Sequence, residues 1–187
     1  MSRLQDNLIE LYPGDVFCSR LMPDHNDGII KRTGTRILNS SILLFQKIWS
    51  TDGEARYCHA GIILNKDGDT LEALGTVRRQ NIFQDYDNAA LLIGRHIKMN
   101  RYAFIRGYKA IAPHEGEIYP AWRLLLHMVP PLARFIHPLG KPVCSEYQGK
   151  FLNGCGFPGF EHYMGLTPDT TADRIIKWRE FLVVYEA

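Results

Sequence analysis

Hydrophobic and polar positions divide the chain into short segments that fit β-strands and longer ones that fit helices. Two apolar runs within 55–82 flank the polar sequence Asn-Lys-Asp-Gly at 65–68, and this pattern predicts a β-hairpin. Short apolar runs at 13–20, 90–97 and 181–187 predict further strands. The sequence therefore indicates a sheet that contains an antiparallel pair.

Four segments predict helices. Residues 34–49 carry apolar side chains at roughly helical spacing, and 101–112 also fit a helix. A third helix is predicted to begin at Cys144, and a fourth within 167–178, where the run of Thr, Pro and Asp offers N-cap residues. Because these helices occur on either side of the strands in sequence, we expect an α+β domain with an antiparallel sheet packed against helices.

Length and composition are those of one soluble globular domain over 1–187, with 45% hydrophobic and 22% charged residues. The formal net charge is +2 and the 22 Lys and Arg residues are scattered, which argues against nucleic acid as a partner. Residues 1–15 contain no basic segment followed by an apolar core, so the sequence predicts a cytoplasmic location.

The chain has four cysteines, Cys18, Cys58, Cys144 and Cys155. Without a secretory signal, reduced thiols are expected rather than disulfides. No Cys-x-x-Cys pair occurs, and ten residues separate Cys144 from Cys155. The sequence therefore predicts no zinc site, and it suggests no other metal and no cofactor.

Cys144 differs from the others because it lies in "KPVCSEYQGKF" (141–151), after a proline-containing turn and at a predicted helix start. Structural cysteines usually lie inside apolar runs. At a helix start, the first backbone N–H groups and the positive end of the helix dipole favour a thiolate. Cys144 is thus a candidate nucleophile, and a structural cysteine that begins a helix is the alternative.

A candidate base lies on the hairpin. If 65–68 is a four-residue loop, His59 faces Leu74, and Glu72 is its diagonal neighbour on the same face of the sheet. Diagonal neighbours lie about 7–8 Å apart at Cα, within reach of these side chains. Burying both is costly unless they bond to each other or serve a function. Cys, His and Glu are the nucleophile, base and orienter of thiolate chemistry, although a structural His–Glu pair fits the same pattern.

Four short motifs follow one another along the chain: Gly14-Asp15, His59-Ala60-Gly61-Ile62, Glu72-Ala73 and Cys144-Ser145-Glu146. Together they resemble the permuted papain-fold cysteine hydrolases of the NlpC-like superfamily, in the YiiX/YaeF-like branch. In that branch the His-bearing strand precedes the nucleophile. The resemblance covers about 13–176 and implies a circularly permuted papain-like fold.

The resemblance also implies a catalytic triad of Cys144, His59 and Glu72 that hydrolyses an amide bond, in a peptide or acyl amide, through an acyl-enzyme. Murein-type peptides are one candidate substrate. The backbone N–H of Cys144 would donate to the oxyanion. Tyr57 is expected on the face of His59, as a pocket wall or a second donor, and Cys58 on the opposite face, in the core.

Two other functions stay open. Lecithin:retinol acyltransferase-like enzymes share the permuted layout and transfer acyl groups of lipids, but their nucleophile motif is Asn-Cys-Glu-His-Phe-like, and "VCSEY" fits it poorly. A non-catalytic structural or binding module with the same fold is the third hypothesis. Activity-probe labelling separates the enzymes from this module, and lipid-vesicle binding helps to separate the two enzymes.

Residues 119–140 are the most apolar part of an excursion over about 113–141. A membrane-spanning helix is excluded by charged or titratable side chains and a proline pair: Arg123, His127, Pro130, Pro131, Arg134 and His137. Because the stretch runs into Cys144, we expect part of it to form a wall or lid of the cleft, or a lipid-facing surface. A packed helix pair fits equally well. Arg123 and Arg134 are either cleft-rim residues or solvated surface charges.

Overall fold

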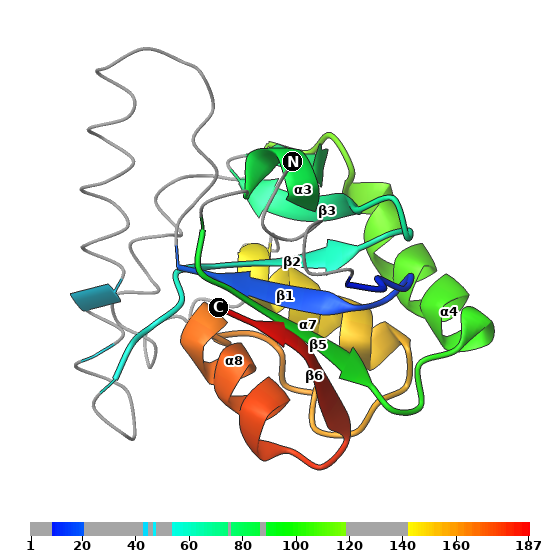
Figure 1. Ribbon diagram of the computed structural model, residues 1–187. Coiled ribbons are helices and arrows are strands. Elements are labelled where there is room, and N and C mark those ends of the chain that lie inside the picture. Colours follow the sequence, from blue (N-terminus) through cyan, green and yellow to red (C-terminus); the bar gives the residue numbers. More distant parts are fainter. Residues whose placement is uncertain are drawn as a thin grey trace.

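The protein is described by a computed structural model for residues 9–20, 43–44, 47, 54–74, 76–86, 89–118 and 142–187. This part of the chain forms an α+β structure around a six-stranded antiparallel sheet of order β4-β3-β2-β1-β5-β6 (Figure 1). The strands are β1 (Val16–Ser19), β2 (His59–Ile63), β3 (Asp69–Leu74), β4 (Thr76–Asn81), β5 (Leu91–His96) and β6 (Phe181–Glu186).

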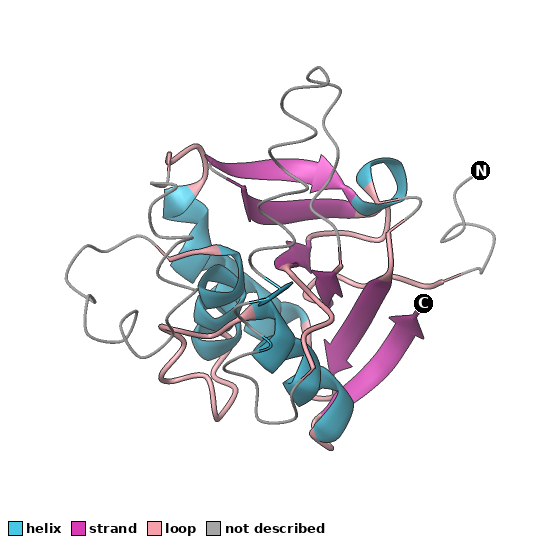
Figure 2. Ribbon diagram, turned by 90° about the vertical axis from the view of Figure 1, so that its left-hand side faces the viewer, coloured by secondary structure: helices cyan, strands magenta, loops and turns pink. Residues whose placement is uncertain are grey.

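The helices pack on both faces of this sheet, with the longer ones grouped on one face (Figure 2). They are α3 (Ile82–Asp85), α4 (Arg101–Ile111), the 3-10 turn η1 (Ala112–His114), α7 (Cys144–Gly154) and α8 (Pro168–Lys177). The larger hydrophobic cluster joins α4, α7 and α8 to the sheet. The smaller cluster lies on the opposite face and includes Phe17, Ile82 and Tyr86.

Local sequence explains where the helices begin. The Asn100 side chain accepts hydrogen bonds from the backbone N–H groups of Tyr102 and Ala103 at the start of α4. At α8 the Thr167 side chain accepts from the N–H of Thr170, and Pro168 occupies the first turn. These contacts satisfy N–H groups that have no partner within the helix.

The hairpin has the predicted register. Gly61 pairs with Glu72 and Ile63 with Thr70, and the N–H of Leu64 donates to the carbonyl of Asp69 at 2.7 Å. The last pair of the β2–β3 ladder is Gly61 with Glu72. His59 therefore lies at the end of β2, beyond the point where β3 is paired to it.

The predicted strands at 13–20, 90–97 and 181–187 are present, as are helices at 101–112, at Cys144 and within 167–178. Strand β4 and helix α3 were not predicted. The β4 sequence "TVRRQN" is mostly polar, and Val77 is its buried residue. An edge strand can be polar because neighbours cover only part of it.

Two other expectations fall largely outside the described residues. Of 34–49, Leu43, Leu44 and Lys47 are helical, and the remainder lies outside. Of the excursion at 113–141 only 113–118 is described, and Ile118 there forms a bridge with Thr76. The wall or lid at 119–140, with Arg123 and Arg134, therefore stays a prediction.

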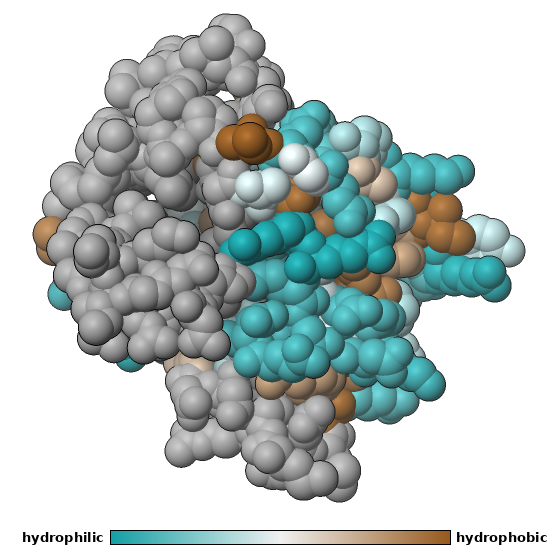
Figure 3. Space-filling model, turned by 90° about the horizontal axis from the view of Figure 1, so that it is seen from above, coloured by the Kyte–Doolittle hydropathy of each residue, from teal (hydrophilic) through white to brown (hydrophobic). Residues whose placement is uncertain are grey.

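The described surface seen from above is mainly hydrophilic, with separate hydrophobic spots (Figure 3). None of the helices in the described ranges combines the length and apolar character needed to cross a bilayer.

Gly61 lies against the side chains of Phe17 and Glu72. A Cβ at this position would lie 2.5 Å from the Phe17 ring and 2.8 Å from Cγ of Glu72. We expect Gly61→Ala to lower the free energy of unfolding by about 1–3 kcal/mol, because overpacking forces these side chains apart. Urea denaturation followed by circular dichroism measures the loss. An unchanged midpoint would show that the position tolerates a methyl group.

Candidate active site

Cys144 is the first residue of α7, as predicted. The helix start is fixed by Glu146, whose Oε2 accepts from the N–H of Val143 at 3.0 Å and whose Oε1 accepts from the N–H of Gly165 at 2.8 Å. The N–H of Tyr147 donates to the carbonyl of Val143 at 2.7 Å. Cys144 consequently sits at the positive end of the helix, among N–H groups that have no partner within it.

Gln148, one turn further along α7, links this helix to the sheet by hydrogen bonds. Its Nε2 donates to the carbonyls of Phe17 at 3.1 Å and Gly61 at 2.9 Å. The hydroxyl of Ser145 donates to the carbonyl of Leu166 at 2.6 Å. The first turn of α7 is thereby held at the end of the β2–β3 ladder, where His59 lies.

His59 and Glu72 are hydrogen-bonded. Nε2 of His59 lies 2.9 Å from Oε2 of Glu72, and both side chains are completely buried. The diagonal placement predicted from the register is confirmed. Asp69 does not take this role, because its carboxylate accepts from Asn65 and Asn81, which lower its pKa.

Cys144 interacts with the same imidazole. Burial lowers the pKa of His59, but hydrogen bonding to Cys144 and Glu72 and the charges of both groups outweigh burial and raise the pKa to about 9. Nδ1 of His59 has no hydrogen-bond partner among the described residues. Since Nε2 is engaged by Glu72, Nδ1 is the nitrogen left for the thiol.

The three residues of the candidate site differ in their exposed fractions. Cys144 is 5% exposed, whereas His59 and Glu72 are 0% exposed. Of these three residues, Cys144 is therefore the one with solvent-accessible surface.

All four cysteines lie in described parts of the chain and are free thiols, as expected. Burial raises the pKa of Cys18 well above its usual value and that of Cys155 to about 12. The thiol of Cys58 donates to the carbonyl of Arg20 at 3.0 Å. Cys18 and Cys155 are therefore held as thiols, and Cys58 is hydrogen-bonded. We interpret these three cysteines as structural residues.

Tyr57 does not share a face with His59. It packs in the larger cluster with Cys18 and Ala60, whereas the ring neighbours of His59 are Phe17 and Tyr86. Burial, with Glu186 and Cys18 nearby, raises the pKa of Tyr57 to about 12. The expectation failed because residue 57 precedes β2, and alternation holds only inside a strand.

Sequence reasoning missed the other donors to Glu72. The hydroxyl of Thr70 donates to Oε1, while Nε2 of Gln80 and the hydroxyl of Tyr86 donate to Oε2. Thr70 lies two residues before Glu72 and could have been found by alternation. Gln80 faces Thr70 across the β3–β4 ladder, which required recognising β4. Tyr86 follows α3 and carries no comparable signal.

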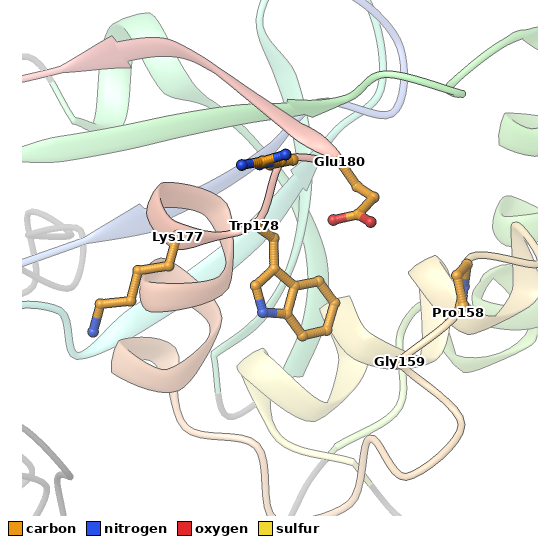
Figure 4. Close-up of a pocket in the computed structure, with 6 residues that line it drawn as sticks. Pro158, Gly159, Lys177, Trp178 and Glu180 are labelled. Atoms are coloured by element: carbon orange, nitrogen blue, oxygen red, sulfur yellow. The ribbon is translucent and has the colours of Figure 1, made fainter.

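A separate open pocket of about 440 Å³ contains none of these residues. Its lining comes from the loop between α7 and α8, from the last residue of α8 and from the turn between α8 and β6: Pro158, Gly159, Lys177, Trp178, Arg179 and Glu180 (Figure 4). The indole of Trp178 packs against Gly159, where a Cβ would approach it to 2.5 Å. Within the described ranges, no cluster of His, Cys, Asp or Glu is arranged to hold a metal ion.

No protein-family model matches this sequence, and no curated protein matches it either.

The charge of His59 can be measured directly. We expect its ring to titrate at about 9, and we expect Cys144→Ala and Glu72→Gln each to lower that pKa, because each removes a partner of the imidazolium. Heteronuclear NMR of the imidazole nitrogens follows this titration. His96 provides an internal contrast, since burial lowers its pKa. If the pKa of His59 is the same in Cys144→Ala as in the wild type, the interaction between the thiol and the imidazole is contradicted.

Proposed function

We propose that the protein is a thiol-dependent hydrolase that cleaves an amide bond through an acyl-enzyme on Cys144. One observation carries this proposal: a buried imidazole is bonded through Nε2 to Glu72 and interacts with a thiol at a helix N-terminus. A structural His–Glu pair alone would not need the third group. Cys144, His59 and Glu72 come from α7, β2 and β3, and their residue types suit the roles of nucleophile, base and orienter.

In this mechanism the Cys144 thiolate attacks the substrate carbonyl carbon and forms a C–S bond. The His59 imidazolium gives its proton to the leaving amine, and the acyl group remains on sulfur. His59, now neutral, removes a proton from water, which attacks the thioester and releases the acid and the thiolate. Glu72 fixes the ring orientation and stabilises its cationic form, while the N–H of Cys144 donates to the oxyanion.

The permuted papain-like fold belongs to the same proposal. It is supported by the antiparallel sheet, by the His-bearing β2 preceding the Cys-bearing α7, and by the packing of α7 on β2 and β3. We propose a peptide or acyl amide as substrate, with murein-type peptides as the first class to assay. Free thiols at all four cysteines support a reducing, cytoplasmic setting.

Labelling tests the nucleophile. Near neutral pH we expect iodoacetamide to alkylate Cys144 at least about tenfold faster than Cys18, Cys58 or Cys155, because only the thiolate reacts. His59→Asn should slow the reaction at Cys144 by removing the counter-ion. Peptide mapping by mass spectrometry assigns the modified residue. Faster labelling of another cysteine in the folded protein would refute the assignment.

Acyl-enzyme formation tests the reaction. With p-nitrophenyl acetate we expect a burst of nitrophenol and an acetyl group on Cys144, both lost in Cys144→Ser and His59→Asn. A panel of peptide amides and acyl lipids then separates amide hydrolysis from lipid acyl transfer. A labelled Cys144 that accepts no acyl group would point to the non-catalytic module.

A further inference from the structure

The Glu72 carboxylate has more partners than its bond to His59 requires. Oε2, the oxygen bonded to His59, also accepts from the hydroxyl of Tyr86 at 2.5 Å and from Nε2 of Gln80 at 3.0 Å. Oε1 accepts from the hydroxyl of Thr70. Because the carboxylate is completely buried, these donors replace the water that an exposed carboxylate would have.

Burial and ring contacts hold Tyr86 in place beside Glu72. Its side chain is 1% exposed, and its ring lies parallel to that of His59, with centroids 6.3 Å apart and an interplanar angle of 5°. The edge-to-face contact with Phe17, at 5.2 Å and 71°, fixes the ring. Burial, followed by the charge of Glu72, raises the pKa of Tyr86 well above its usual value, so the hydroxyl keeps its proton and donates.

We propose that Tyr86, together with Gln80, is a positioning residue of this site. The two donors hold Oε2 of Glu72 where it bonds Nε2 of His59, which keeps Nδ1 available to Cys144. This inference rests on the proposed function. A carboxylate without these donors would turn toward other partners, and its hydrogen bond to the imidazolium would weaken.

The matched substitution is Tyr86→Phe, which removes the hydroxyl and keeps the ring. The readout is the rate of Cys144 alkylation as a function of pH, with iodoacetate compared with neutral iodoacetamide. A neighbouring imidazolium attracts the anionic reagent, so the iodoacetate preference disappears as pH rises through the pKa of His59, which is about 9 in the wild type. In Tyr86→Phe we expect this midpoint to fall by about one unit, and alkylation near neutral pH to slow about tenfold.

Tyr147→Phe is the control. Tyr147 is equally buried, and its hydroxyl donates to the carbonyl of Ile111 at 2.7 Å, so this variant loses a buried tyrosine hydrogen bond that does not involve Glu72. We expect it to lower stability and leave the midpoint unchanged. A purely structural role of Tyr86 would lower the melting temperature in the same way without moving the midpoint.

The outcomes separate this inference from the proposed function. If wild-type Cys144 shows neither preferential alkylation nor an iodoacetate preference, both fail. If the wild type shows both and Tyr86→Phe has the wild-type midpoint, only the positioning role is wrong. If Tyr86→Phe does not fold, Gln80→Leu is the second variant, because it removes a donor to the same oxygen from a partly buried strand position. A lowered pH midpoint of the iodoacetate preference in Gln80→Leu supports the inference, and an unchanged midpoint overturns it.

Discussion

The buried carboxylate of Glu72 joins three strands and the end of α3 through hydrogen bonds. Glu72 is 0% exposed, and a buried charge is tolerated only when hydrogen bonds and an opposite charge replace its hydration. Its donors come from β2, from β3 itself, from β4 and from the residue that ends α3. The strand register at this end of the sheet and the position of α3 are therefore tied to the chemistry of a single side chain.

The end of the β2–β3 ladder is the second constraint. The pairing stops at Gly61 and Glu72, and Gln148 donates to the carbonyls of Gly61 and Phe17. A helix that packs on one face of the sheet can thereby bring its first residue to a histidine whose ring neighbours lie in the cluster on the other face. Gly61 leaves room for the side chains of Phe17 and Glu72, because a larger residue would collide with both.

Two buried histidines show what the partners contribute. His96 stacks on Phe157 with ring centroids 3.6 Å apart, and burial lowers its pKa. His59 is more deeply buried, yet its pKa rises to about 9 because Cys144 and Glu72 stabilise the cation. Burial alone would make a neutral imidazole, so the charge state suited to thiolate chemistry comes from the two neighbours.

The hairpin, its register and the helix that begins at Cys144 could be predicted from the sequence, because they depend on turn residues, alternation and local capping. The same alternation placed Glu72 beside His59. The meeting of Cys144 with His59 was decided only by tertiary structure, since 85 positions separate them in the chain and no local pattern encodes that distance. Gln80 and Tyr86 were hidden for a related reason: a polar edge strand and a residue after a short helix carry no periodic signal, and only packing brings them to the carboxylate.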